Sequence, residues 1–286
     1  MQKLQNFRDF FEMDVMFRSF GISFVDDMMS MWGRIFNHVS YVELSLIIIQ
    51  LIVGMYKNLK LSGGFINIVE QICLMRISFQ TLLSGYLIFY KYRHVMVGII
   101  QTLKDMYPET ASTSQIQNIN QKYKILNFFV DFSYISRIFC IIMYGIKPFL
   151  VYFYESYMQR SPVLMLPYDV YFPFDTADMF VYSIAYFLLI WASITLIIQL
   201  RSCDLIYCSI LSVISIQFDI LTEKVRNVHP HNENARNILK DYVENQIVLL
   251  NLISDLNGIY NWILVYNFLT SSIFLCSLTF LVLVSQ

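Results

Sequence analysis

The chain has 286 residues, of which 57% are hydrophobic and only 14% are charged. Soluble domains usually carry about 25% charged residues, so this composition argues against a water-soluble globular protein. The formal net charge of −1 provides no basic field that would attract nucleic acid, and no nucleic-acid-binding motif occurs. The composition therefore favours an integral membrane protein and excludes a nucleic-acid-binding one.

The amino-terminal residues, MQKLQNFRDFFEMDVMF, mix charges of both signs with aromatic side chains. They lack the basic start, the apolar run and the small-residue cleavage site of a signal peptide. We therefore expect an internal apolar segment to direct insertion into the membrane.

Five apolar runs are candidates for membrane spans. Residues 179–200 and 262–284 contain no Asp, Glu, Lys or Arg, and each exceeds the roughly 20 residues that cross a hydrocarbon core about 30 Å thick. Residues 37–56, 65–90 and 125–153 are also mainly apolar but carry charged side chains. Backbone groups in hydrocarbon must be hydrogen-bonded internally, and the alternating pattern of a barrel is absent. The sequence predicts an all-α integral membrane helical bundle of five spans.

The distribution of Lys and Arg predicts the orientation of these spans. Most of the basic residues lie in the amino-terminal segment, the second loop and the fourth connection, and few lie in the first loop, the third loop and the carboxyl tail. Basic residues concentrate on the cytoplasmic side of membrane proteins. The amino terminus is therefore predicted to lie in the cytoplasm, and the carboxyl end of a five-span chain on the outer side.

The chain between the fourth and fifth spans is predicted to form a cytoplasmic helical layer, residues 201–261, within a single membrane domain that covers residues 1–286. The uncharged run 205–218 is too short for a sixth crossing, so we interpret it as a continuation of the fourth helix. The polar stretch 109–121 is predicted to be a linker between helices. A repeat of about 3.5 residues then predicts one long helix over 237–284, with a packing seam. The seam comprises Leu239, Tyr242, Gln246, Leu249, Ile253, Leu256, Tyr260 and Ile263.

Two stretches resemble the insect odorant receptor family. The first is LMLPYDVYFPFDTADMFVYSIAYF at residues 164–187, the loop before the fourth span and the start of that span. The second is NQIVLLNLISDLNGIYNWILVYNFLTSSIFLCSLTFLVL at residues 245–283, which is similar to the family's cytoplasmic helix and fifth span. The predicted cytoplasmic amino terminus agrees with the family's topology.

The resemblance implies an odorant-binding subunit of a heteromeric, ligand-gated, non-selective cation channel in the plasma membrane of olfactory neurons. Its ligand would be a small, volatile, mostly apolar odorant, and its partner would be a common co-receptor that binds through the cytoplasmic helical layer. Because members of the family have seven spans, the chain is expected to be truncated after the fifth. It would then lack the helix that lines the pore and the sixth span, which contributes to the odorant pocket.

Topology places the expected odorant pocket in the outward halves of the spans. Odorant sites should be mainly apolar and aromatic with few polar groups. The candidates for ligand contact are Ile72, Met75, Phe79, Phe139, Met143, Tyr144, Tyr182 and Tyr186. The candidates for an extracellular lid over the pocket are Tyr168, Tyr171, Phe172 and Phe174. Helix packing or lipid contact is the alternative for the first set, and an interfacial aromatic belt is the alternative for the second.

Charged side chains within the predicted spans need a partner or a wet cavity, because an unpaired charge at mid-bilayer costs at least about 2.5–3.5 kcal/mol. Such residues include Glu70, Arg76, Asp131, Arg137 and Lys147. They are candidates for a polar ligand anchor or a gating network. The alternatives are side chains that reach the interface or structural ion pairs.

Other functions find less support in the sequence. No HExxH, GxSxG, Walker or GxGxxG motif occurs, so we expect neither an enzyme nor a cofactor. The cysteines lack CxxC spacing, and His229 and His231 flank a proline in a predicted turn, so no metal site is predicted. A G-protein-coupled receptor would need an external amino terminus, and a transporter would show matched broken helices. A receptor fragment without channel activity remains an alternative.

Overall fold

A computed structural model describes most of the chain outside the amino-terminal segment and several connections. The described residues are Phe7, 31–60, 65–108, 113–158, 165–168, 170–174, 178–226, Val228 and 235–284. Nearly all of them are helical, and no strand occurs among them. The predicted all-α class is confirmed. His229 and His231 lie outside the described residues, as does the amino-terminal segment apart from Phe7.

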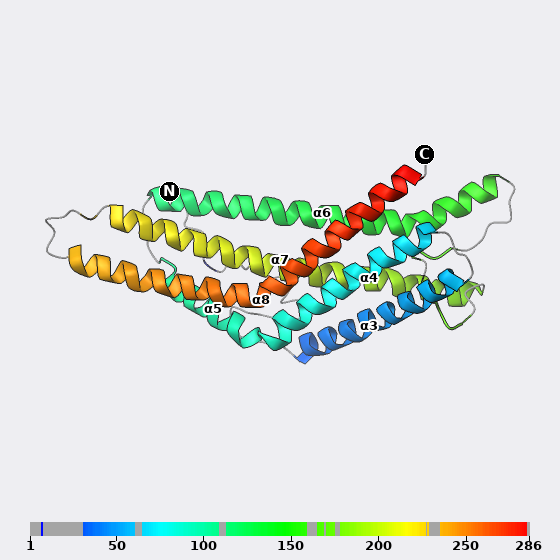
Figure 1. Cartoon of the computed structure of the whole chain (residues 1–286), viewed down its shortest axis with the longest axis horizontal. Helices are drawn as coiled ribbons and strands as arrows, with labels where there is room; N and C mark the ends of the chain where they lie inside the picture. Colours follow the sequence, from blue (N-terminus) through cyan, green and yellow to red (C-terminus); the bar gives the residue numbers. More distant parts are fainter. Residues whose placement is uncertain are drawn as a thin grey trace. The chain divides into compact units, whose positions relative to one another are not determined.

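In the part of the chain that the structure describes, five α-helices run the length of a membrane span or more, and one shorter helix and one π-helical turn connect two of them (Figure 1). In chain order the elements are α3 (Met31–Lys60), α4 (Phe65–Tyr86), η1 (Leu87–Lys91), α5 (Arg93–Met106), α6 (Thr113–Tyr157), α7 (Met179–Arg226) and α8 (Ala235–Val284).

Helices α7 and α8 continue far beyond one span, as the sequence predicts. Helix α7 runs through the uncharged stretch 205–218 without a break, and α8 is a single helix of 50 residues. Asp178 caps the amino terminus of α7, because its Oδ1 accepts hydrogen bonds from the backbone N–H groups of Phe180 (2.8 Å) and Val181 (3.4 Å). The polar linker is shorter than predicted, since α6 begins at Thr113.

Among the described residues, five helical segments are long and apolar enough to cross a membrane. They are His38–Lys60, Gln71–Lys91, Gln115–Tyr157, Met179–Arg226 and Ala235–Ile273. These segments overlap the five predicted spans. Few of their side chains are buried within the chain, and in the most apolar part of α6 only 6% of the residues are buried. Apolar helices with such exposed surfaces are suited to lipid or to neighbouring helices.

The chain forms two compact units. Unit 1 comprises Met1–Ile35, Leu87–Phe132 and Ser202–Asn261, and unit 2 comprises Phe36–Tyr86, Ser133–Arg201 and Trp262–Gln286. Ser202–Asn261 of unit 1 nearly coincides with the segment predicted to form the cytoplasmic layer. Whether unit 1 lies outside the bilayer stays a prediction.

Unit 1 has an aliphatic core to which α5, α6, α7 and α8 each contribute. Fully buried members are Met96, Ile99, Ile100, Leu103, Ile119, Ile210, Ile216 and Leu249. The predicted seam of α8 is oriented inward: Leu249, Leu256 and Tyr260 are buried. The Tyr260 ring also packs at a tilt against Tyr207, with ring centroids 4.4 Å apart, and its hydroxyl donates a hydrogen bond of 3.3 Å to the Cys203 carbonyl. Only Leu239, at the start of the seam, is exposed.

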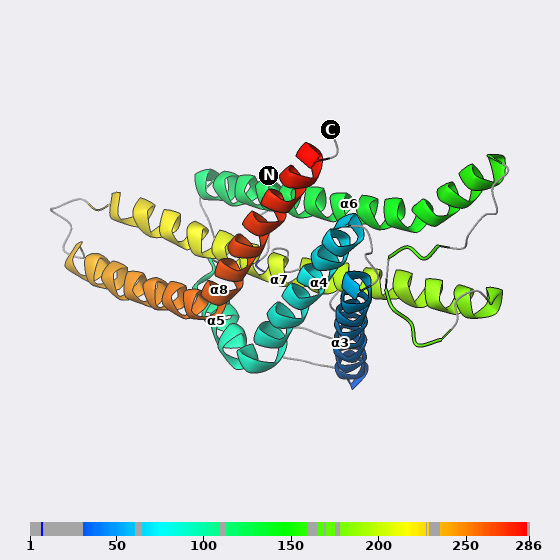
Figure 2. The same cartoon turned by 45° about the vertical axis from the view of Figure 1, so that its right-hand side comes forward.

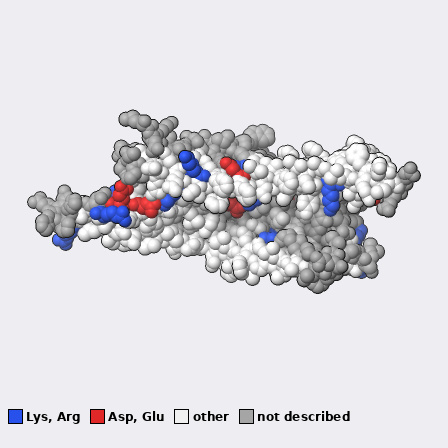
Figure 3. All heavy atoms as spheres, turned by 90° about the horizontal axis from the view of Figure 1, so that it is seen from above, with Lys and Arg blue, Asp and Glu red and all other residues white. Residues whose placement is uncertain are grey.

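Charged side chains on the face seen in Figure 3 gather where the carboxyl-terminal part of α7 and the amino-terminal part of α8 lie. Lys224 and Arg226 occupy the last turn of α7, and Lys240 pairs with Glu244 on α8 at 3.7 Å. Within unit 1, Lys122 of α6 also forms an ion pair of 2.5 Å with Asp219 of α7. Such a charged surface favours contact with water over contact with lipid.

Unit 2 is organised around a small cluster made by three of its elements. Leu51 of α3, Val170 of the loop before α7 and Leu189 of α7 are buried together. Partly buried side chains that pack against them include Ile47, Leu74, Met75, Leu166, Tyr168 and Phe172. Figure 2 shows α3 and α4 from a second direction. This cluster fixes the loop against the helices and so forms one wall of the site described below.

Candidate functional site

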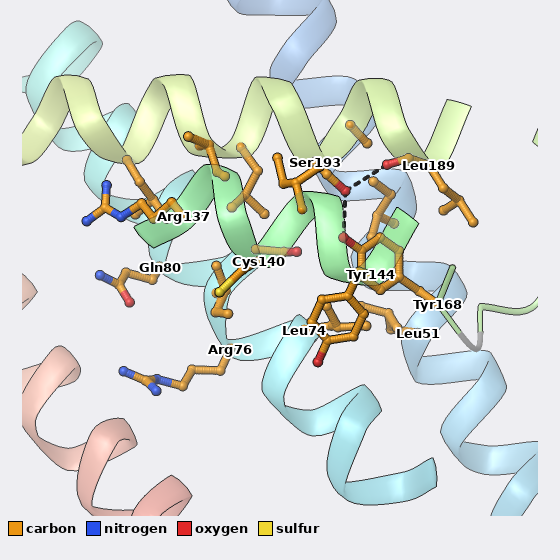
Figure 4. A pocket seen from close by; sticks show the side chains of 18 of the residues that line it. Leu51, Leu74, Arg76, Gln80, Arg137, Cys140, Tyr144, Tyr168, Leu189 and Ser193 are labelled. Atoms are coloured by element: carbon orange, nitrogen blue, oxygen red, sulfur yellow. Dashed lines mark hydrogen bonds between the residues drawn. The ribbon is translucent and has the colours of Figure 1, made fainter. Parts of the chain in front are cut away.

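A cavity of about 400 Å³ lies within unit 2, bounded by α3, α4, α6, α7 and the loop before α7 (Figure 4). Its volume falls in the range of pockets that bind small molecules, roughly 300–1,000 Å³. Most of its surface is apolar. The aliphatic residues that line it are Ile47, Leu51, Leu74, Ile77, Ile141, Val170, Leu189, Ala192, Leu196, Ile197 and Leu200.

The loop before α7 folds back onto the helices and covers part of this cavity. Its Val170 is buried against Leu51, and its Tyr171 ring lies 3.5 Å from the ammonium nitrogen of Lys57. A cation over an aromatic face is attractive, so this contact ties the loop to the end of α3. Gly54 allows α4 to approach α3 closely, because a Cβ there would lie 3.0 Å from Gln71 Nε2, whereas the backbone nitrogen of Tyr171 in the loop, at 3.7 Å, would be at an ordinary contact distance.

Tyr168 is the aromatic residue of this loop that lines the cavity. Its ring packs against Tyr144 of α6 with centroids 5.1 Å apart, and its hydroxyl accepts a hydrogen bond of 2.9 Å from Ser193 of α7. Ser193 Oγ also lies 2.8 Å from the carbonyl oxygen of Leu189. One residue of the loop therefore connects two helices of the pocket wall.

Truncation of Tyr168 should test how the loop contributes to binding. We expect Tyr168→Ala to weaken ligand binding about tenfold or more, because it removes a wall of the pocket and its contact with Tyr144. Tyr168→Phe keeps the ring and removes the hydrogen bond with Ser193, and a neutral hydrogen bond is worth about 0.5–1.5 kcal/mol. Displacement of an apolar fluorophore from the purified protein measures both effects. Equal losses for the two variants would contradict the role of the ring.

Polar side chains gather on one side of the cavity. In Figure 4, Arg76 and Gln80 of α4 and Arg137 of α6 lie on the side away from Tyr144 and Tyr168, with Cys140 between the two groups. The lining set of described residues contains no Asp or Glu. The pocket therefore has a cationic side and an aromatic and aliphatic side.

Arg76 also ties α4 to α8. Its Nε donates to Thr270 Oγ1 at 2.8 Å, and its Nη2 donates to Ser271 Oγ at 2.6 Å. Thr270 Oγ1 in turn lies 2.8 Å from the Tyr266 carbonyl oxygen of its own helix. These contacts give a membrane-embedded guanidinium hydrogen-bond acceptors, which such a group needs in hydrocarbon.

Of the residues proposed from the sequence, the structure places Tyr144 and Tyr168 in the cavity wall. Tyr182 and Tyr186 do not line the cavity, and their hydroxyls donate to backbone carbonyl groups instead. The Tyr182 hydroxyl donates to the Met165 carbonyl at 2.9 Å, and the Tyr186 hydroxyl donates to the Gly145 carbonyl at 2.6 Å. Both hydroxyls thus position the loop and the helix of the pocket.

Three other proposed residues, Ile72, Met75 and Phe79, line a second cavity of about 400 Å³ between α3, α4 and α8. Arg76 borders both cavities. Phe139 and Met143 are exposed on α6 and belong to neither lining.

The remaining members of the proposed lid do not line the main cavity. Phe172 packs on the cluster around Leu51 and contacts Phe174 with ring centroids 5.1 Å apart. Phe174 is exposed, and Tyr171 is held by Lys57. These three residues stabilise the loop that carries Tyr168.

Among the charged residues of the predicted spans, Arg76 and Arg137 border the main cavity. The ammonium nitrogen of Lys147 lies 5.9 Å from the centre of the Tyr144 ring, and Asp131 is exposed. The side chain of Glu70 lies outside the described residues.

Sequence reasoning missed the aliphatic lining residues and five others, namely Ser78, Gln80, Ser136, Cys140 and Ser193. A signal for some of them was present. Arg76 and Gln80 are four residues apart, as are Ser136, Cys140 and Tyr144, and residues four apart share one helix face. Two polar stripes of this kind on neighbouring spans indicate where the spans face each other.

The comparisons with known proteins identify the family. The sequence pattern of the 7tm Odorant receptor family matches residues 65–286, more than half of the chain. The chain belongs to this family. With five apolar helices among its described residues it is a multi-pass membrane protein, and the family is one of receptors rather than enzymes. The resemblance that the two sequence stretches indicate is confirmed.

Relatives and solved structures agree with the assignment. Odorant receptor 85c of Drosophila melanogaster is 23% identical over 259 residues, which cover 88% of this chain and 65% of that receptor. The insect olfactory receptor OR5 from Machilis hrabei shares the fold, with a TM-score of 0.67, 13% identity, and coverage of 95% of this chain and 72% of that one. The structure of OR5 in complex with eugenol gives a TM-score of 0.69 at 14% identity, over 96% and 70% of the two chains. The chain thus spans about two thirds of the length of its relatives.

Proposed function

We propose that this odorant receptor family member is the odorant-binding subunit of a ligand-gated, non-selective cation channel. The observation that carries the proposal is the mainly apolar cavity in unit 2, which has a few polar groups at defined positions. Cavities of this composition bind small apolar molecules, because burial of apolar surface supplies the affinity and a few polar groups set the orientation. The Machilis receptor of the same fold was solved with eugenol, a small aromatic molecule.

The proposed ligand is a small, mostly apolar odorant, with Tyr144 and Tyr168 as its aromatic contacts. The proposed orientation has the amino terminus in the cytoplasm and the loop before α7 on the outer side of the plasma membrane, as the distribution of Lys and Arg favours. A ligand would then approach the cavity from outside, past the loop.

The proposed partner is the co-receptor of the family, bound through the helical layer at 201–261. An exposed apolar stripe on α8 supports this part of the proposal. Its members, Leu239, Val243, Ile247 and Leu250, recur at intervals of three and four residues and are each about half exposed. In a layer that faces water, such a stripe is suited to burial against a neighbouring subunit.

Odorant-evoked current tests the proposal as a whole. Protein that carries this chain, expressed with the co-receptor in oocytes, should conduct cations when a small apolar odorant such as eugenol is added. The co-receptor alone and the vehicle alone are the matched controls. Absence of current over a broad odorant panel, with receptor present at the cell surface, would refute the channel function.

A further inference from the structure

We propose that the second cavity of unit 2 binds the hydrocarbon chain of a bilayer phospholipid. This cavity has a volume of about 400 Å³ and lies between α3, α4 and α8. Among the described residues, it shares only Arg76 with the lining of the main cavity. The proposal therefore concerns a separate site and does not depend on odorant binding.

The lining of this cavity is apolar on all three helices. Apart from Arg76 and Thr270, its described members are aliphatic, aromatic or sulfur-containing. Phe79 of α4 and Tyr266 of α8 pack together, with ring centroids 5.4 Å apart. A polar group placed among apolar side chains loses hydrogen bonds that it makes in water. The ligand that matches this lining is therefore itself hydrocarbon.

The two polar residues of the lining are bonded to each other. Arg76 is directed toward α8 (Figure 4), and its Nε donates to Thr270 Oγ1 at 2.8 Å. Thr270 Oγ1 also lies 2.8 Å from the carbonyl oxygen of Tyr266 on its own helix. A polar ligand would have to compete with these bonds, whereas a hydrocarbon chain leaves them intact.

The position of the cavity gives lipid chains access to it. All three helices belong to segments that are long and apolar enough to cross a membrane. Each helix also contributes to the lining at least one side chain that is between 40% and 62% exposed, and these side chains are Ile52, Ile72, Phe79 and Ile273. The cavity therefore opens at the surface of the bundle, where the helices meet the bilayer.

The energetics favour a lipid chain over a dissolved odorant as the occupant. An empty apolar cavity is unfavourable, because its lining atoms lack van der Waals partners on one side. A lipid chain restores these contacts, and it leaves surroundings that are as apolar as the cavity itself. Lipid is also the solvent of these helices, so its concentration far exceeds that of an odorant, and occupancy follows concentration.

Photocrosslinking in lipid nanodiscs tests the proposal. The probe is a phosphatidylcholine with a diazirine midway along one acyl chain, and mass spectrometry of the purified protein locates the crosslinks. We expect crosslinks to Cys73 and Met75, which line the cavity and are only partly exposed. Phe139 on α6 is 60% exposed and lines neither cavity, so its crosslinks measure ordinary contact with the bilayer.

Two neighbouring residues of α3 provide a matched pair of variants. Ile48 lines the cavity, whereas Ile49 is 57% exposed and lines neither cavity. Ile48→Trp should lower the crosslinking of Cys73 and Met75 at least about fivefold, because the indole fills the space of the chain. Ile49→Trp should leave it unchanged, and neither variant should alter the crosslinking of Phe139.

Binding of the apolar fluorophore to the main cavity serves as the check on folding. It should stay within about twofold in Ile48→Trp, since a change of that size is only about 0.4 kcal/mol. Ile72→Trp fills the cavity from α4 and replaces Ile48→Trp should that variant fail this check. Failure of the odorant proposal would appear as the absence of fluorophore displacement by eugenol in the unchanged protein, with crosslinking at Cys73 unaffected.

Three results would overturn the proposal. Absence of crosslinks at Cys73 and Met75 in the unchanged protein would show that another part of the protein fills the cavity. Loss of these crosslinks on addition of eugenol, or of cholesterol to the nanodiscs, would assign the cavity to an odorant or to a sterol. Crosslinking that persists in both Ile48→Trp and Ile72→Trp would place the lipid chain outside the cavity.

Discussion

A Cys140→Trp substitution should abolish ligand binding in this member of the odorant receptor family. Cys140 borders the cavity between its polar and apolar sides, so a large ring at this position occupies the space that the ligand needs. A bulky aromatic side chain buries about 150–250 Å², so the indole would cover cavity surface that the ligand would otherwise contact. We expect at least a hundredfold loss of affinity, about 2.7 kcal/mol, in the fluorophore displacement assay, and a matching loss of odorant-evoked current.

Met143→Trp is the matched control for this prediction. Met143 lies on the same helix, is 52% exposed and does not border the cavity, so the same ring there should leave binding unchanged. Cys140→Ser should also bind normally, because it changes the volume little. Normal binding by Cys140→Trp, or loss of binding in both tryptophan variants, would show that the cavity in unit 2 is not the ligand site.

The helices could be predicted from the sequence because their signal is local. Charge-free runs such as 179–200 are longer than a bilayer core requires, and backbone groups in hydrocarbon require a helix where the alternating pattern of a barrel is absent. The extensions of α7 and α8 followed from the same reasoning, since uncharged residues 205–218 and the seam around Leu249 continue the helical pattern.

The pocket was harder to predict, because it depends on which helix faces meet. Topology selected the outward aromatic residues, and of these Tyr144 lines the cavity. The Tyr186 hydroxyl instead donates to the Gly145 carbonyl of α6. This bond lies one turn before Pro148, a proline inside the helix that has no N–H to donate to the carbonyl of Tyr144. Helix rotation decides such outcomes, and a single sequence carries no direct record of it. The pairs of polar residues at positions i and i+4 are the feature of the sequence that indicates which helix faces meet.

Removal of two hydroxyl groups from α8 should destabilise unit 2 more than removal of the arginine to which they bond. The double variant Thr270→Val, Ser271→Ala leaves the Arg76 guanidinium in the apolar bundle without two of its acceptors. Hydrogen bonds to charged groups contribute about 1.5–3 kcal/mol in water-soluble proteins, whereas hydrogen bonds between membrane helices average about 0.6 kcal/mol. Because the Arg76 guanidinium is charged, we expect a value closer to that for charged groups, so the double variant should lose about 2 kcal/mol of unfolding free energy. That corresponds to a fall in melting temperature of roughly 4–8 °C.

Arg76→Met should cost less, because the Thr270 hydroxyl still lies 2.8 Å from the carbonyl of Tyr266 on its own helix, and the methionine side chain fills the same apolar space. In the combined triple variant, loss of the hydroxyls should have almost no further effect. Thermal unfolding of the four proteins in nanodiscs measures the coupling between Arg76 and α8, which we expect to be about 1–2 kcal/mol. Additive losses would show that the guanidinium finds other acceptors and that the contact with α8 does not stabilise the bundle.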